Sequence, residues 1–372
     1  MRITDIEGIM LRLPEVRPIG DGCQSVLLLR VHTDAGITGI GEVHSNPLVN
    51  KAVLDAPLCS VSAEGMRSLL VGEDPRDIGR LWDKMYRHSQ TYGRRGVAMH
   101  VMSGIDIALW DILGKVAGLP LYRLLGGARR KSHRAYASDL SQPSLEATVA
   151  LARKHRDAGY RAMKFGWGEL GSDVRDDVRR VAAIREAVGD ELDIMLDMGF
   201  PVPLDDAIYL GRALAEHRVY FLEEPLSPDD VGGFAKLVAA SPTPIATGEK
   251  ETSLHGFVDL MDRGELRIVQ PDVARVGGIS EAMRIAAHCE SRNVRMIPHC
   301  WSTDILVAAT LHVVSTLRDC PYLEYNVTDN PLRTELLVAP IRPRDGILHV
   351  PEGPGLGIEL DEDTIARYRW DG

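Results

Sequence analysis

The first 43 residues alternate apolar and polar side chains in three runs, at residues 3–13, 25–33 and 37–43. A period of two is typical of β-strands that bury one face. The segment Asp34-Ala35-Gly36 separates the last two runs with residues that favour a tight turn. The pattern therefore predicts an antiparallel meander of three strands at the start of the chain.

A helical pattern follows this meander. Four apolar residues recur at steps of four, three and four: Ile105, Leu109, Ile112 and Val116. This spacing lines one face of a helix. Gly118 and Pro120 are typical of a helix end, and the glycine-rich, basic stretch 124–131 indicates a domain boundary.

From about residue 133, short β-rich runs alternate with helical stretches. The runs lie at residues 134–137, 161–165, 193–196, 219–222, 244–247, 267–270, 295–298 and 321–323. Eight βα-like units favour a parallel barrel over a doubly wound sheet, which usually has fewer strands. After about residue 341 the strand and turn pattern returns, and we expect this tail to pack against the first part of the chain.

A titratable side chain stands at the end of each run except the first. These residues are Lys164, Asp197, Glu223, Glu249, Asp272, His299 and Glu324. Successive members are 23 to 33 residues apart, which is one βα unit each. Because parallel barrel strands all end at one mouth, where such folds place catalytic groups, we expect these side chains to meet there.

Three of these residues are consecutive carboxylates, Asp197, Glu223 and Glu249. Taken singly, each is better explained as an ordinary strand-end residue or as the N-cap of the following helix. Together they would repel one another unless a cation lay between them, and oxygen ligands suit Mg²⁺. The regular spacing therefore favours a magnesium site.

The remaining strand-end residues predict acid/base chemistry. An Asp on one strand and a His on the next can form a hydrogen bond that orients the imidazole and raises its basicity, as expected for Asp272 and His299. Lys164 would lie beside the carboxylates, where a salt bridge to one of them or to Glu324 is the structural alternative. Glu324 would be costly as a buried anion, so we expect a protonated acid that donates to a substrate carboxylate.

Composition limits the partners and the location. The chain has 372 residues, 45% hydrophobic and 26% charged, which is typical of a globular protein of two domains. A net charge of −10 argues against nucleic acid and membrane surfaces, whereas a bound metal would still allow a small anionic substrate. Five cysteines without C-x-x-C spacing, no signal-peptide core and no apolar stretch of spanning length predict a cytoplasmic location.

The strand-end set resembles the enolase superfamily, and within it the mandelate racemase-like branch that includes many acid-sugar dehydratases. Three further segments resemble that family's capping domain and its passage into the barrel: Gly36-Ile37-Thr38-Gly39-Ile40-Gly41-Glu42, Ser103-Gly104-Ile105-Asp106-Ile107-Ala108-Leu109-Trp110-Asp111 and Leu121-Tyr122-Arg123-Leu124-Leu125-Gly126-Gly127. The metal ligands match in Leu-Asp-Met-Gly, Phe-Leu-Glu-Glu-Pro and Thr-Gly-Glu-Lys. The resemblance implies an α/β fold and a homo-oligomer. It places a modified TIM barrel, (β/α)7β, at residues 128–340 and an α+β capping domain at residues 1–127, completed by the tail 341–372.

One position distinguishes the branches of this family. The muconate-lactonizing and dipeptide-epimerase branch would have a Lys five residues before the paired Gly277-Gly278, and here that residue is Asp272. With His299 one strand later, the chain is similar to the racemase-like branch and its His–Asp dyad. Glu324 matches that branch's electrophilic Glu.

The chain departs from the family at the end of the second barrel strand. The family commonly has Lys-x-Lys there, with the second Lys as a base on the face opposite the His, but this chain has Lys164-Phe165-Gly166. A racemase needs a base on each face, so the loss disfavours racemisation and favours elimination of water. Lys164 would then hold the substrate carboxylate or, as the less favoured option, be the base; Lys250 or a capping-loop residue is the alternative replacement. We expect Trp167 and the space left by Gly166 to shape the pocket.

The resemblance and the departure together predict a Mg²⁺-dependent dehydratase of an aldonate or aldarate. His299, oriented by Asp272, would remove the proton α to the carboxylate, and the 3-hydroxyl would leave to give a 2-keto-3-deoxy acid. The alternatives are a racemase, epimerase or cycloisomerase that uses the same intermediate, and more remotely a metal-dependent binding protein without turnover. We expect loops 17–24 and 42–50 to close the mouth, with His44 as a substrate-binding candidate and an ordinary surface histidine as the favoured alternative.

Overall fold

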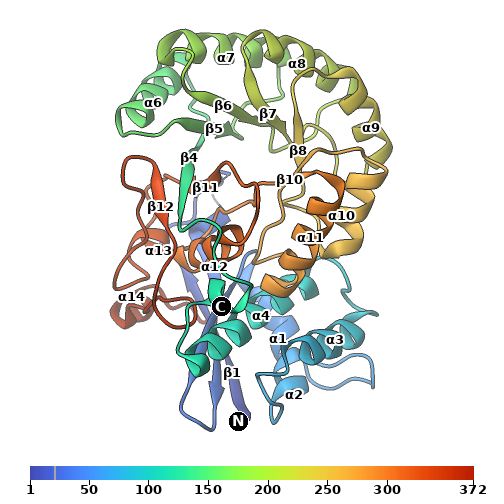
Figure 1. The fold of residues 1–372 in the computed structure, drawn as a ribbon, viewed down its shortest axis with the longest axis vertical. Helices are drawn as coiled ribbons and strands as arrows, with labels where there is room; N and C mark the ends of the chain where they lie inside the picture. The colour runs from blue at the N-terminus through green and yellow to red at the C-terminus, as the bar shows by residue number, and fades with distance from the viewer. Residues whose placement is uncertain (21) are drawn as a thin grey trace.

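The N-terminal part is built on an antiparallel sheet (Figure 1). The computed structural model describes residues 1–20 and 22–372, so Asp21 of the predicted mouth loop lies outside the described residues. Within them, the sheet has the order β1 (Ile3–Arg12), β2 (Ser25–Thr33) and β3 (Thr38–Val43). The predicted meander is confirmed, and Gly36 adopts a φ of +73° in its second turn, where glycine avoids a steric penalty.

Helices α1 (Pro47–Asp55), α2 (Met66–Leu70) and α4 (Val97–Ala117) pack against this sheet. Helices α3 (Ile78–Ser89) and α5 (Leu121–Leu124) pack against α4, and η1 (Gly22–Gln24) precedes β2. The apolar face predicted for α4 is buried except at its last position, because Val116 lies in the final turn and is 41% exposed. Gly41 allows β3 and α4 to approach closely, since a Cβ there would lie 2.0 Å from the carbonyl oxygen of Gly104.

Helix α4 is also long and apolar enough to cross a membrane by length and composition. Most of its residues are buried inside the structure, against β3, α3 and α11. It is therefore a core helix.

Every predicted barrel run overlaps a strand, although the eighth, 321–323, does so only at Leu323. In the part of the chain that the structure describes, eight parallel strands are present: β4 (Ser132–Leu140), β5 (Ala162–Gly166), β6 (Asp193–Asp197), β7 (Val219–Glu223), β8 (Ile245–Thr247), β9 (Ile268–Val269), β10 (Arg295–Met296) and β11 (Leu323–Asn326). Their order is β10-β9-β8-β7-β6-β5-β4-β11. The helices that follow the first seven strands are α6 (Leu145–Asp157), α7 (Val174–Val188), α8 (Leu204–Glu216), α9 (Val231–Ala240), α10 (Ser253–Asp262), α11 (Gly278–Arg292) and α12 (Asp304–Ser315). The strands curl inside these helices, which gives the predicted (β/α)7β barrel (Figure 1).

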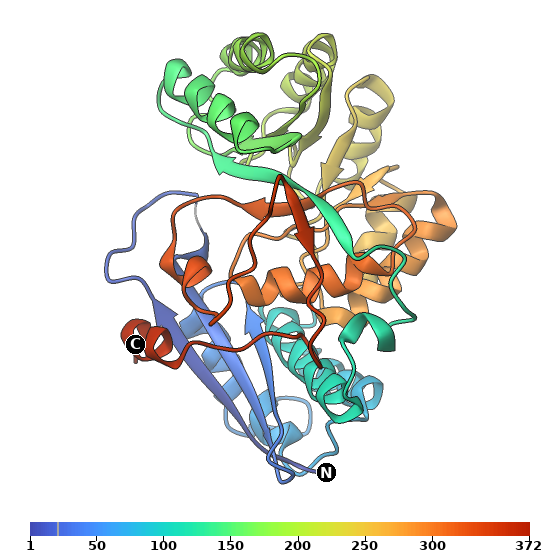
Figure 2. The ribbon, with the colours of Figure 1, turned by 60° about the vertical axis from the view of Figure 1, so that its left-hand side comes forward.

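The C-terminal tail contacts both parts of the molecule. It contains α13 (Pro331–Thr334), β12 (Ile347–His349) and α14 (Glu362–Tyr368). Strand β12 pairs with barrel strand β4, so this segment does not pack on the N-terminal sheet as expected. Further along, the Trp370 amide donates to the Met10 carbonyl of β1 at 2.9 Å, and α14 lies beside the N-terminal strands (Figure 2).

Candidate active site

The barrel strands direct two sets of side chains inward. The first set fills the inside with buried residues: Tyr136, Ala162, Met195, Phe221, Ala246, Ile268, Ile297 and Tyr322. Because side chains alternate between the two faces of a strand, a step of two residues leads inward again. It gives a second set near the carboxyl ends: Ser138, Lys164, Asp197, Glu223, Gly248, Gln270, His299 and Glu324. Most predicted site residues belong to this set, while Glu249 and Asp272 lie just beyond their strands.

The three predicted metal ligands lie together. Asp197, Glu223 and Glu249 are buried, and one oxygen atom from each lies within 4.8 Å of the others. Burial raises the pKa of Glu223 well above its ordinary value; Lys164 opposes this shift and Asp197 adds to it. The pKa of Asp197 is raised for the same reason, with Lys164 opposing and Glu249 adding. An all-oxygen set of crowded carboxylates fits a hard divalent cation such as Mg²⁺.

Lys164 lies between these carboxylates and Glu324. Its Nζ is 2.7 Å from Glu223 Oε1, 2.8 Å from Glu324 Oε1 and 3.5 Å from Asp197 Oδ2. Burial opposes the charge on Lys164, but Glu223 and Glu324 raise its pKa well above the ordinary value. In this arrangement Lys164 is a cation, which fits an electrostatic role and not that of the base.

Glu324 differs from the expected protonated acid. Its Oε1 accepts hydrogen bonds from Ser138 Oγ and Lys164 Nζ, both at 2.8 Å, and its Oε2 accepts from the Cys300 amide at 2.7 Å. Burial raises its pKa, but Lys164 and His299 outweigh that effect and lower it. Because donors surround both oxygens, Glu324 is an ionised acceptor that holds Lys164.

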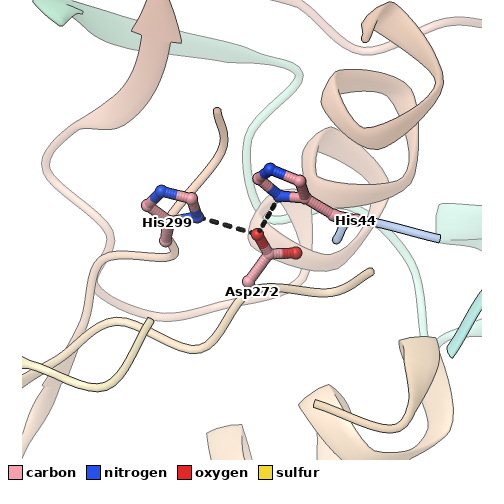
Figure 3. Close-up of side chains that lie close together, drawn as sticks. All are labelled: His44, Asp272 and His299. Atoms are coloured by element: carbon pink, nitrogen blue, oxygen red, sulfur yellow. Dashed lines mark hydrogen bonds and ion pairs between the residues drawn. The ribbon is translucent and has the colours of Figure 1, made fainter. Parts of the chain in front are cut away.

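Asp272 and His299 form the predicted dyad, and His44 joins them (Figure 3). Asp272 Oδ2 lies 2.7 Å from His299 Nδ1 and 3.0 Å from His44 Nδ1. Burial opposes protonation of His299, but Glu249, Glu324 and Asp272 raise its pKa to about 9. His44 is buried and not a surface residue, because the loop after β3 carries it under the mouth of the barrel.

A cavity of about 280 Å³ lies over these groups. Its walls include Gly20, Gly22 and His44 from the N-terminal part and Lys164, Asp197, Glu249 and His299 from the barrel. The N-terminal part and the barrel thus enclose the site together, and residues of both predicted mouth loops, 17–24 and 42–50, line the cavity.

Comparison with known proteins identifies the family. Residues 147–364 match a family model described as "Enolase C-terminal domain-like", and residues 15–126 match "Mandelate racemase / muconate lactonizing enzyme, N-terminal domain". The chain is a member of the mandelate racemase/muconate lactonizing enzyme family of the enolase superfamily.

Curated relatives of this enolase-superfamily member include dehydratases and cycloisomerases. The D-galactarolactone cycloisomerase of Agrobacterium fabrum is 33% identical over 357 residues, which cover 92% of this chain and 91% of that protein. The arabinonate dehydratase of Saccharolobus solfataricus is 32% identical, over 95% of this chain and 93% of its own. The crystal structure of the 3,6-anhydro-D-galactonate cycloisomerase from Zobellia galactanivorans has a TM-score of 0.89 at 32% identity and covers 100% of both chains. The chain is therefore an enolase-superfamily enzyme that acts on a carboxylate substrate.

Gly166, where this chain departs from the family's Lys-x-Lys, lies close to the proposed metal ligand Asp197. A Cβ at position 166 would lie 2.9 Å from Asp197 Oδ2 and 3.0 Å from its Cβ. Gly166 lines the cavity together with Trp167, and Asp197 lies directly beside it. A side chain at position 166 would require Asp197 to shift.

Trp167 adjoins this position and lines the cavity. Its backbone has a φ of +63°, which is unusual for a tryptophan, and its ring packs edge-on against Phe200 at 5.1 Å. A Cβ at Gly20 or Gly199 would approach the ring to 2.7 or 2.8 Å, so both glycines make room for it. Trp167 therefore lies between the first mouth loop and the loop after β6.

Several site residues of this enolase-superfamily enzyme were missed by the sequence analysis. Arg275 and Asp139 line the cavity, and Gln270 donates to Glu223 Oε2 at 2.8 Å. Ser138 and Gln270 follow from the two-residue step along the strands, and Asp139 follows the first predicted run, whose end residue went unassigned. Arg275 lies three residues after Asp272, but no pattern in the sequence indicated that its side chain turns back toward the dyad.

Proposed function

We propose that this protein is a Mg²⁺-dependent dehydratase of a sugar acid, an aldonate or aldarate. The observation that supports this best is the asymmetry of the site. The site has a His299–Asp272 dyad, whereas Gly166, at the family's usual second-base position, carries no side chain, and a Cβ there would lie 2.9 Å from Asp197 Oδ2. A reaction that needs only one base and a leaving group fits this arrangement, whereas racemisation or epimerisation needs a base on each face.

Asp197, Glu223 and Glu249 would hold the cation. When bound, Mg²⁺ supplies positive charge that stabilises the enediolate formed when the α-proton leaves. Lys164 adds a second positive charge from within the protein, and Glu324 fixes its ammonium at 2.8 Å. These positive charges would stabilise the negative charge that develops on the substrate carboxylate, which is the main energetic barrier to removing the α-proton.

His299 is the proposed base. Asp272 binds its Nδ1, so Nε2 is the ring nitrogen that faces the carboxylate cluster, 3.2 Å from Glu249 Oε2. Nε2 accepts the α-proton, the electron pair forms the enediolate, and the C3–O bond then breaks. The same imidazolium gives its proton to the departing hydroxyl, so water leaves and the enol becomes a 2-keto-3-deoxy acid. Trp167 is the proposed pocket residue for the rest of the substrate; His44, the other candidate, lines the same cavity but has protein partners at both ring nitrogens.

A cycloisomerase is the second candidate. Two of the similar proteins have this activity in their names, the A. fabrum and Z. galactanivorans enzymes. The same base would then remove the α-proton from a cyclic sugar acid, and a ring oxygen would leave in place of the hydroxyl. The proton that His299 removes is returned to the product when the ring opens, so this reaction is a net isomerisation and needs no second base either.

A screen distinguishes the candidates. The Mg²⁺-loaded protein is incubated with aldonates, aldarates, their lactones and anhydro sugar acids, and products are followed as 2-keto acids and by NMR. We expect loss of water from a small set of linear sugar acids and no reaction after chelation. Reaction of cyclic substrates alone favours the cycloisomerase, exchange of the α-proton without loss of water favours an isomerase, and no turnover favours a binding protein. The homo-oligomer, the cytoplasmic location and the domain boundaries at residues 127 and 340 stay predictions.

A further inference from the structure

His44 attaches the N-terminal part of the chain to the dyad. It follows β3, its backbone amide donates to the Ala274 carbonyl at 3.5 Å, and its Nδ1 lies 3.0 Å from Asp272 Oδ2. The side chain is only 3% exposed. The contact therefore joins residues 228 positions apart and bridges the N-terminal sheet and the barrel.

The neighbours of His44 determine which nitrogen carries the proton. Arg275 Nη2 lies 3.1 Å from His44 Nε2, and a guanidinium only donates hydrogen bonds. Nε2 must therefore accept, which places the proton on Nδ1, where it is donated to Asp272 (Figure 3). A neutral ring results, and burial together with Arg275 lowers the pKa of His44 to about 4 in agreement with this.

Two other roles fit this arrangement less well. His44, Asp272 and His299 are close enough to hold a metal ion, but the guanidinium of Arg275 lies 3.6 Å from Asp272 Oδ2 and already supplies positive charge there. Substrate binding would need a free ring nitrogen, and both nitrogens of His44 already have partners in the protein.

We infer that His44 is a positioning residue for the proposed acid/base dyad, an inference that rests on the function proposed above. Asp272 Oδ1 accepts the Ala274 amide at 2.7 Å, and Oδ2 accepts from both imidazoles, so the carboxylate is held from every side. The His44 ring lies parallel to that of His299, at 5.8 Å and an interplanar angle of 13°. His44 thereby fixes the plane of Asp272 and, through it, the direction of His299 Nε2. The dyad has this support from His44 only when the N-terminal part is docked on the barrel.

Two substitutions test the roles of the two ring nitrogens of His44 separately. The amide nitrogen of His44→Asn lies where Nδ1 was and still donates to Asp272, whereas that of His44→Gln reaches the Nε2 position and does not. We expect kcat of H44Q to fall on the order of 10- to 100-fold, the range for a lost hydrogen bond to a charged group. H44N should exceed H44Q in kcat by about 10-fold, with KM within about two-fold of wild type in both. His255→Asn, on an exposed part of α10, is the control for replacing a histidine.

Equal kcat values for H44N and H44Q, or a raised KM at unchanged kcat, would overturn the inference in favour of a structural or substrate-binding role. Nitrogen-15 spectra of the histidine rings provide a measurement that does not need turnover, with the His44 signal assigned by its absence in H44N. At pH 7 we expect a neutral ring with the proton on Nδ1, and an imidazolium or an Nε2–H ring would overturn the assignment. If wild-type protein turns over no sugar acid, the proposed function fails and these spectra alone decide the role of His44.

Discussion

Lys164 Nζ lies 2.7 Å from Glu223 Oε1, and both side chains are buried at the carboxyl ends of β5 and β7. The same ammonium forms ion pairs with Glu324 at 2.8 Å and with Asp197 at 3.5 Å. The raised pKa values of Asp197 and Glu223 show that the crowded carboxylates are costly to ionise here. A divalent cation would favour their ionised forms, and the following prediction tests this.

Mg²⁺ should stabilise the folded protein. At 100 times its dissociation constant, a ligand that binds only the folded state adds about 2.7 kcal/mol, so we expect the Tm to rise by several degrees and chelation to reverse the rise. Glu223→Gln removes a ligand charge and should abolish most of this shift. Glu216→Gln makes the same chemical change at an exposed site on α8 and should keep it. An identical shift in both variants would place the cation elsewhere.

Gly166→Ala should weaken metal binding. Its Cβ would push against Asp197 Oδ2 at 2.9 Å, so the ligand must move. We expect about a 10-fold loss of Mg²⁺ affinity, which corresponds to about 1.4 kcal/mol, in calorimetric titrations. Gly232→Ala on α9, where a Cβ meets nothing within 4 Å, is the matched control. Unchanged affinity in G166A would show that Asp197 is not held in this position.

Asp272→Asn should lower the pKa of His299. Burial disfavours the protonated ring, while Glu249, Glu324 and the hydrogen bond that Asp272 accepts from it favour it and raise the pKa to about 9. Without the last of these, the pKa falls. Because the base acts in its neutral form, activity rises as the pH passes through this pKa, and the rising limb of kcat/KM should move to lower pH in D272N. We also expect kcat to fall by about 10²- to 10⁴-fold. A limb that moves to higher pH would contradict the dyad.

Gly20→Ala should disturb Trp167. The added methyl group would lie 2.7 Å from the ring, so the indole or the mouth loop must shift. We expect a changed tryptophan fluorescence and a KM raised several-fold, with a smaller effect on kcat, since Trp167 lies in the pocket wall and away from the dyad. Gly79→Ala on α3 meets no atom within 4 Å and should change neither. A G20A enzyme with unchanged KM would remove Trp167 from the substrate pocket.

Regular features of the chain predicted most of the fold. The runs with a period of two are strands in the structure. The spacing of one βα unit correctly predicted that Asp197, Glu223 and Glu249 lie together. These predictions succeeded because a parallel barrel converts sequence spacing into position at one mouth. The ionised state of Glu324 did not follow, because it depends on the donors of Lys164 and Cys300 around it.

Contacts between the N-terminal part and the barrel could not be predicted from the spacing of residues along the chain. His44 was assigned to the surface, since nothing in its local sequence shows that β3 ends beneath the mouth of the barrel. Likewise, the sequence did not show how closely Asp197 on the next strand approaches Gly166. Distances across the structure decided both cases.

The central claim is that His299 removes the α-proton of the substrate. It is tested most directly with His299→Asn and an accepted sugar acid in deuterated water, with α-proton exchange and 2-keto acid followed in the same sample by NMR. We expect both to fall together by about 10²-fold or more, while Mg²⁺ still raises the Tm as in wild type. Exchange that continues at the wild-type rate in H299N would contradict the claim and make Lys164 the leading base.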